Sequence, residues 1–321
     1  MDTRTNNYIG GLHHITVLAD DGRRNVEFYA GVLGLRLIKQ TVNFDDPGVY
    51  HLYYGDQTGS PGTILTFFPY RGLPPGKTGI GQSVVVSFSL PLSSLAFWEQ
   101  RLKRLDIAFE KPSERFNREA LISLKDLDGL KLELVFNELD TREGFASGHI
   151  PAKHAIRGLF GTELWVEDLA PTAGLLTGLM THQLLAEQGS RMRFGVEDSP
   201  GKYVDVQVPS HKAQGRNGNG SVHHIAFRTP GQLSQNILWE KLRGAGMHPT
   251  PVIDRQYFRS VYFREPGGVL FEIATDDPGF LVDESAETLG QSLMLPSRHE
   301  NRRHELEAVL PALDVNLSPY Y

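Results

Sequence analysis

The chain has 321 residues, of which 40% are hydrophobic and 22% are charged, and 38 acidic against 32 basic residues give a formal net charge of -6. This composition is typical of a globular protein with room for two ordinary domains, and the scattered Lys and Arg disfavour nucleic acid or an anionic membrane as a partner. No apolar stretch reaches the ~20 residues of a membrane helix, and residues 1–7 lack the apolar core of a signal peptide, so we expect a cytoplasmic protein. Because there is no cysteine, any metal must be held by nitrogen and oxygen.

Four segments of the chain share one expected order of elements, a strand, a helix and then further strands. The first module covers about 9–70, and its amphipathic helix should end at Gly34. Its expected strands are 12–18, 49–54 and 62–68. The second module has a helix that Ser93 or Ser94 could cap. Its expected strands are 83–88 and 129–135.

The polar stretch 137–153 has no clear period and is the expected linker to the second half of the chain. The third module has an expected helix at 171–180 and strands at 161–166, 191–195 and 203–208. After a loop rich in Gly and Asn, the fourth module has a helix ending near Gly244 and strands at 222–228, 260–264 and 268–274. The tail should contain one amphipathic helix, 298–310.

We therefore expect an α+β protein in which four βαβββ modules pair two and two into half-open barrels. The expected division is an N-terminal domain at 1–147, a C-terminal domain at 148–283 and a tail at 284–321 packed on the modules. The cup inside such a curved sheet is a natural place for a small ligand.

Two strands of the chain carry the same pair of adjacent histidines. Leu-His-His-Ile in the first module, with His13 and His14, returns as Val-His-His-Ile in the fourth, with His223 and His224. Side chains alternate between the faces of a strand, so His14 and His224 take equivalent positions. The last strand of the fourth module places Glu272 among apolar residues, where an unpaired carboxylate would cost several kcal/mol. Two imidazoles and one carboxylate predict a facial metal site with open positions, suited to Fe(II), with Mn(II) or another divalent ion as alternatives.

The other modules act as an internal control. The second module has Glu133 at the position that matches Glu272, but valines where the histidines would be, and the third has Asp205 near that position without histidines. The first module offers Thr66 there. Only the first and fourth modules together supply a full ligand set, so we expect them to face each other and the other two to form an inactive pseudo-site. The other histidines are not expected to bind the metal, and His51 is interpreted as structural.

These motifs resemble the vicinal oxygen chelate superfamily, which includes glyoxalase I, fosfomycin and bleomycin resistance proteins and extradiol dioxygenases. The resemblance rests on the double-histidine strands, on Tyr-His-Leu-Tyr-Tyr at 50–54, on His-Ala-Ile-Arg-Gly at 154–158 and on Gly-Gly-Val-Leu-Phe-Glu at 267–272. Within the superfamily the chain looks most like ring-cleaving dioxygenases that act on hydroquinones, because one ligand lies in the first module.

The resemblance implies Fe(II) bound by His14, His224 and Glu272, and a small aromatic substrate and O2 as partners. It further implies catalytic roles for residues around the metal: His13, His223, Thr16, Arg255 and Tyr262. Arg or Tyr can hydrogen-bond a phenolate, and a histidine that is not a ligand can move a proton. A homo-oligomer is left open.

Two other functions are alternatives. A glyoxalase-like isomerase or lyase would keep the fold and the metal, but its chemistry usually needs a second carboxylate at the metal, where this chain has Thr66. A protein that only sequesters a small molecule needs the cup but not the ligand triad.

Overall fold

The structure is a computed structural model that describes residues 8–116, 119–196, 199 and 201–321. In the first module, Asp21 caps the first helix by accepting a hydrogen bond from the backbone N–H of Arg24 at 3.0 Å. The helix then widens into π-helical turns. The elements are β1 (Leu12–Ala19), α1 (Gly22–Val26), η1 (Glu27–Val32), β2 (Arg36–Val42), β3 (Tyr50–Gly55) and β4 (Ile64–Pro69).

The second module contains two strands that the sequence pattern did not predict. Ser94 precedes its helix, but the hydroxyl donates to Pro91 O at 2.6 Å and does not cap the helix. The elements are β5 (Gln82–Pro91), η2 (Leu92–Ser94), α2 (Leu95–Arg104), β6 (Ser113–Arg115), β7 (Glu119–Lys125) and β8 (Lys131–Asn137).

The second half of the chain repeats the same order of elements. The third module consists of η3 (Ala152–His154), β9 (Gly158–Trp165), α3 (Leu169–Thr177), β10 (Gln183–Gln188), β11 (Arg191–Gly195) and β12 (Tyr203–Gln207). The fourth consists of β13 (Val222–Thr229), α4 (Gln232–Gly244), β14 (Ile253–Asp254), β15 (Phe258–Arg264) and β16 (Leu270–Pro278). The tail contains η4 (Phe280–Val282), η5 (Glu300–Arg302), α5 (Arg303–Val309) and η6 (Ser318–Tyr320).

The strands form two curved sheets with the order β14-β15-β16-β13-β1-β4-β3-β2 and β10-β11-β12-β9-β5-β8-β7-β6. In every module the first strand runs parallel to the last, and the modules join through the antiparallel pairs β1 with β13 and β5 with β9. The predicted fold of four βαβββ modules paired into two half-open barrels is confirmed. The first module shares a sheet with the fourth and the second with the third, whereas the division of the chain after residue 147 stays a prediction.

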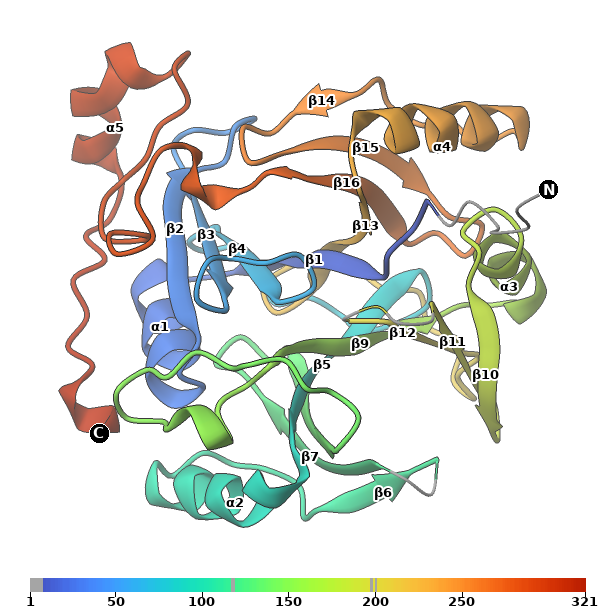
Figure 1. The fold of residues 1–321 in the computed structure, drawn as a ribbon, viewed down its shortest axis with the longest axis horizontal. Helices are drawn as coiled ribbons and strands as arrows, with labels where there is room; N and C mark the ends of the chain where they lie inside the picture. The colour runs from blue at the N-terminus through green and yellow to red at the C-terminus, as the bar shows by residue number, and fades with distance from the viewer. Residues whose placement is uncertain (1–7, 117–118, 197–198, 200) are drawn as a thin grey trace.

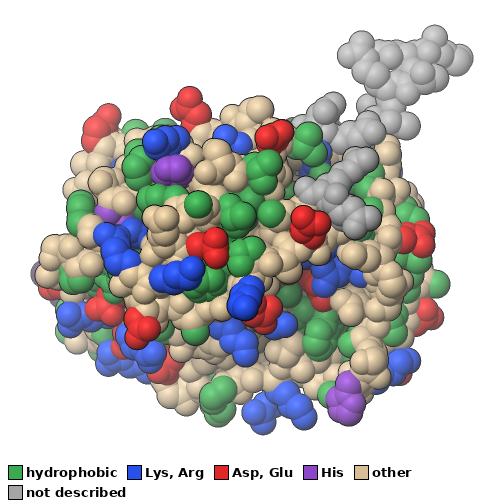
Figure 2. All heavy atoms as spheres, turned by 90° about the horizontal axis from the view of Figure 1, so that it is seen from below, with side chains coloured by type: hydrophobic (Ala, Val, Ile, Leu, Met, Phe, Trp, Pro, Cys, Tyr) green, Lys and Arg blue, Asp and Glu red, His purple; other side chains and the backbone are tan. Residues whose placement is uncertain are grey.

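The helices α1 to α4 lie outside the two sheets, whereas α5 lies with the tail beside the edge strand β2 (Figure 1). One continuous hydrophobic core runs beneath both sheets, and a small separate cluster of Leu121, Val135 and Phe160 lies in the second sheet. Acidic and basic side chains are interspersed on the face shown in Figure 2, without a large patch of one sign. Among the described residues, none of the helices has the length and hydropathy needed to span a membrane.

The tail contacts the first module and bridges the two open edges of the first sheet. Residues 280–295, here called the closing segment, pair with the edge strand β2, where the backbone N–H of Met294 donates to Gln40 O at 2.8 Å. Next to the opposite edge strand, β14, the Gln256 amide donates to Asp283 at 2.8 Å. Because β2 and β14 are the outermost strands, the closing segment covers the open side of this half-barrel.

His182, between α3 and β10, is an example of a buried structural histidine. Nδ1 lies 2.9 Å from Met180 O, the ring stands edge-on to Phe227, and Nε2 has no hydrogen-bond partner among the residues that the structure describes. Burial lowers the pKa of His182 to about 4, although the bond to Met180 opposes this shift. Below about pH 6.5 the unfolded chain therefore binds a proton at this residue that the folded chain does not bind, so protonation favours unfolding.

We expect the free energy of unfolding to decrease as the pH is lowered, and part of this decrease to depend on His182. Between about pH 6.5 and 5, it should fall by about 2 kcal/mol more in the natural chain than in the His182→Gln variant. Urea unfolding across this range measures the difference. His248→Gln, which alters an exposed histidine, is the control and should leave the pH dependence unchanged. If the free energy of unfolding depended on pH equally in the natural chain and in His182→Gln, the prediction would be contradicted.

Candidate metal centre

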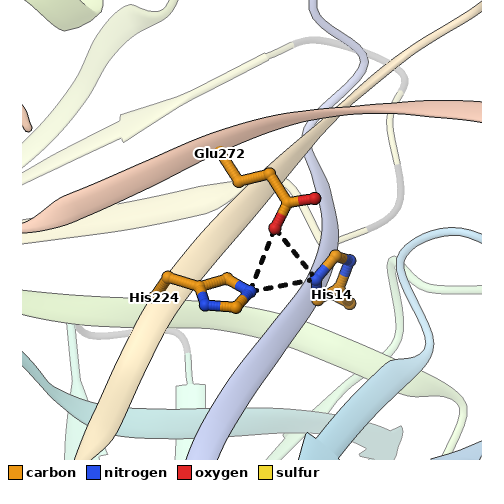
Figure 3. A group of neighbouring side chains, drawn as sticks. All are labelled: His14, His224 and Glu272. Atoms are coloured by element: carbon orange, nitrogen blue, oxygen red, sulfur yellow. Dashed lines mark hydrogen bonds and ion pairs between the residues drawn. The ribbon is translucent and has the colours of Figure 1, made fainter. Parts of the chain in front are cut away.

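His14, His224 and Glu272 converge on one point of the concave face of the first sheet (Figure 3). They come from three adjacent strands, β1, β13 and β16. The two Nε2 atoms are 3.3 Å apart, and Glu272 Oε2 lies 3.3 Å from that of His14 and 3.0 Å from that of His224. The three side chains are 1%, 5% and 0% exposed. The structure therefore brings together all three predicted ligands.

The donor set fits a divalent cation. Glu272 Oε1 accepts a hydrogen bond from Ser260 at 2.5 Å, whereas Oε2 faces the two imidazoles and, apart from them, has no partner among the described residues. Burial raises the pKa of Glu272, but His14 and His224 outweigh it and hold the pKa well below its usual range. Burial lowers the pKa of His224, which favours the neutral imidazole that a metal requires. An ionised carboxylate oxygen and two ring nitrogens within 4.8 Å of one another form the two-histidine, one-carboxylate set typical of non-haem iron.

The adjacent histidines orient the two imidazoles of the triad. His13 Nδ1 lies 2.9 Å from His14 Nδ1, and His223 Nδ1 lies 2.8 Å from His224 Nδ1. Occupied Nδ1 atoms leave both Nε2 atoms for the metal, an arrangement common around metal-bound histidine. Burial, followed by the charge of the neighbouring histidine, lowers the pKa of His13 well below its usual value and that of His223 to about 3. Both side chains are therefore neutral at neutral pH.

A cavity of about 310 Å³ opens beside the triad. Its walls are mostly aromatic and apolar, with polar groups gathered near the triad, as is usual for small-molecule sites. The lining residues are His14, Leu18, Asn43, Phe44, Asp45, His51, Tyr53, Phe68, Tyr70, His223, His224, Arg255, Phe258, Tyr262 and Leu270. Of the five residues predicted to act around the metal, His223, Arg255 and Tyr262 line this cavity, whereas His13 and Thr16 do not.

Arg255 and Tyr262 lie together in the cavity wall. Arg255 Nε donates to the Tyr262 hydroxyl at 3.3 Å, and the Tyr262 ring stands edge-on to His224 with the centroids 5.5 Å apart. Burial, followed by the charge of Glu272, raises the pKa of Tyr262, so the phenol keeps its proton and can donate a hydrogen bond. The pair therefore supplies donors beside the triad.

Thr16 and His51 belong to one chain of hydrogen bonds. Thr16 Oγ1 lies 2.8 Å from Thr66 Oγ1, Thr66 Oγ1 lies 2.9 Å from His51 Nε2, and His51 Nδ1 lies 2.8 Å from the Tyr53 hydroxyl. His51 and Tyr53 also line the cavity beside the triad, so the structure places at the site a histidine that the sequence analysis interprets as structural. The repeat could have revealed the connection, since Tyr53 pairs with Thr66 as Tyr262 pairs with Glu272.

The second half-barrel has arginines close to its inward carboxylates. Glu133, which matches Glu272, accepts a hydrogen bond from Arg115 at 2.8 Å. Arg193 donates to Asp205 at 2.7 and 2.9 Å. Buried carboxylates are stable when a cation pairs with them, and here guanidinium groups supply that charge.

The chain matches the sequence model of the "Glyoxalase/Bleomycin resistance protein/Dioxygenase superfamily" over residues 11–134 and 160–273. It is 42% identical over 306 residues to the "Putative ring-cleaving dioxygenase MhqO" of Bacillus subtilis (strain 168), covering 95% of this chain and 97% of that protein. It is 33% identical to the "Chlorohydroquinone/hydroquinone 1,2-dioxygenase" of Sphingobium indicum, covering 93% of this chain and 95% of that protein.

Solved structures agree with these sequence matches. A crystal structure described as a putative dioxygenase from Bacillus subtilis superimposes with a TM-score of 0.93 at 41% identity and covers 97% of this chain and 99% of that one. Glyoxalase I from Zea mays, at 15% identity, superimposes with a TM-score of 0.62, covers 83% of this chain and 92% of that one, and shares the fold. The chain therefore belongs to the glyoxalase/bleomycin resistance protein/dioxygenase superfamily.

Proposed function

We propose that the chain is a non-haem Fe(II) ring-cleaving dioxygenase that acts on a hydroquinone-type ring. The observation that carries the proposal is the convergence of His14, His224 and Glu272 beside a cavity with aromatic walls. The names of the two relatives at 42% and 33% identity support a ring-cleaving dioxygenase, and the second supports hydroquinone as the kind of ring.

The reaction would add both atoms of O2 to the ring and break one carbon–carbon bond, so it needs no external reductant. His14, His224 and Glu272 would hold a divalent iron, which would supply the redox coupling between the substrate and O2. His223 lines the cavity as a neutral imidazole, and because its Nδ1 accepts from His224, its Nε2–H would be the group that donates a hydrogen bond or a proton to the substrate or to O2. Arg255 and Tyr262 would hydrogen-bond the resulting phenolate, and the apolar wall would exclude water.

The five residues around the triad divide into two roles under this proposal. His223, Arg255 and Tyr262 line the cavity and would touch the substrate. His13, hydrogen-bonded to His14, and Thr16, hydrogen-bonded to Thr66, would act by positioning their neighbours. A glyoxalase-like isomerase is less well supported, because Thr66 occupies the position of a second carboxylate and its hydroxyl already bonds Thr16 and His51.

Oxygen uptake tests the proposal directly. Protein loaded with Fe(II) in the absence of air should consume O2 with methylhydroquinone and little with catechol. The reverse preference would indicate an extradiol dioxygenase for catechols. Uptake with neither substrate, despite stoichiometric bound metal, would contradict the dioxygenase proposal and favour the isomerase or lyase class.

A further inference from the structure

The charge of the cavity is set by one ion pair at its mouth. Arg255 is the only Arg or Lys among the described residues that line the cavity. Its Nη1 lies 3.0 Å from Asp45 Oδ2, and its Nε bonds the Tyr262 hydroxyl. The Arg255 side chain is 17% exposed and that of Asp45 is 71% exposed, so the carboxylate stands at the outer end of the guanidinium.

Hydrogen bonds fix the position of the loop that carries Asp45. It joins β2 to β3, and the backbone N–H of Asn43 donates to Val49 O at 2.8 Å across it. The Asn43 side chain accepts from the backbone N–H of Asp45 at 3.0 Å and donates to the Tyr70 hydroxyl, in the cavity wall, at 3.0 Å. The position of the Asp45 carboxylate therefore depends on the cavity wall as well as on Arg255.

A count of charges shows what this ion pair does to the site. A divalent metal with ionised Glu272 has a charge of +1, which a phenolate substrate of charge -1 neutralises. Asp45 neutralises Arg255 in the same way, so a monoanionic substrate leaves the cavity with no net charge. Among the described residues that line the cavity, no Arg or Lys besides Arg255 would pair with a second negative charge on the ring, and the nearby Asp45 carboxylate would repel that charge.

We propose that Asp45 sets the substrate specificity of this site by occupying Arg255, so that hydroquinones with uncharged ring substituents are accepted and those with a carboxylate are rejected. The inference rests on the proposed function and specifies its substrate class. Asp45 acts through Arg255 and is a positioning residue. Removal of its charge frees the guanidinium for a substrate carboxylate, which a planar guanidinium binds well.

The test compares two ligands of one shape and different charge. Homogentisate, a hydroquinone with a carboxymethyl substituent, and its uncharged amide are offered to the full, metal-loaded chain. Binding is measured without O2, and kcat/KM is measured with it. The natural chain should favour the amide by roughly tenfold or more, and Asp45→Asn should reduce this preference by about the same factor. Asp45→Glu should restore the preference for the amide.

Asp46→Asn is the matched control, because it removes the same charge from the next residue of the loop. Burial, followed by the charge of Asp46, raises the pKa of Tyr70. Among the described residues, no contact between Asp46 and Arg255 is seen. Its ratio of amide to homogentisate binding should stay close to that of the natural chain. Equal binding of both ligands to the natural chain would overturn the inference, as would a ratio that Asp45→Asn leaves unchanged or that both Asn variants change alike.

Failure of the proposed function would look different. If the natural chain consumed no O2 with methylhydroquinone, the dioxygenase proposal would fail. The binding ratios, measured without O2 or turnover, would still decide the role of Asp45.

Discussion

The Glu272→Gln variant should fold, lose its bound metal and lose turnover by roughly a thousandfold or more. Glutamine has the shape of glutamate, and its amide can keep the hydrogen bond with Ser260. Glutamine lacks the negative charge that offsets the charge of the metal, and the amide atom that would face His14 and His224 is a weaker metal ligand than a carboxylate oxygen. Metal content per chain, oxygen uptake with methylhydroquinone and the midpoint of thermal unfolding measure the three expectations.

The internal repeat supplies the control for this variant. Glu133→Gln makes the same change at the matching position of the second half-barrel, where the carboxylate bonds Arg115 and Ser87. Because the lost charge pairs with a guanidinium, this variant should keep its metal and its oxygen uptake and lose about 1 to 3 kcal/mol of stability. Full metal content in Glu272→Gln, or equal metal loss in both variants, would show that the triad is assigned wrongly.

The strands that carry the triad could be predicted because their apolar pattern is strong and occurs twice. Strands β2, β6, β7, β10 and β14 were missed, and β2 shows why. It turns Lys39 and Thr41 inward, and both are fully buried by segments distant in the sequence. Period-two hydrophobicity is absent from such a strand, so its burial follows from long-range pairing that local patterns do not contain.

The candidate site, like the fold, could be predicted from the sequence only in part. Equivalent positions in the first and fourth modules are enough to predict the three candidate ligands, because strand parity and a repeat can be read from the sequence alone. The connection of His51 to the site depends on the register of β3 against β4, and the pairing of Arg255 with Asp45 depends on two loops 210 residues apart. Contacts of this kind are determined by how the curved sheet brings distant segments together and not by local sequence.

Lys39→Met should destabilise the protein by about 3 to 5 kcal/mol, because it removes the cation from a buried cluster of charges. Lys39 is fully buried on β2, and its Nζ contacts Asp283, at 2.6 Å, and Glu284 in the closing segment. The ring of Tyr257 lies 5.0 Å from the same nitrogen. Without Lys39, two carboxylates would remain beside an apolar wall, so the closing segment should detach and become sensitive to proteolysis. Urea unfolding and limited proteolysis measure these effects.

Two further variants test whether the charges of this cluster are the cause. Lys103→Met changes an exposed lysine that pairs within one helix and should cost less than about 1 kcal/mol. Adding Asp283→Asn and Glu284→Gln to Lys39→Met removes the unpaired carboxylates and should recover part of the lost stability.

Asp283 also accepts a hydrogen bond from Tyr257, which packs against Tyr53 in the cavity wall. Lys39→Met should therefore lower oxygen uptake while the triad keeps its metal. Stability equal to that of Lys103→Met would mean that the ion pairs of Lys39 do not hold the closing segment.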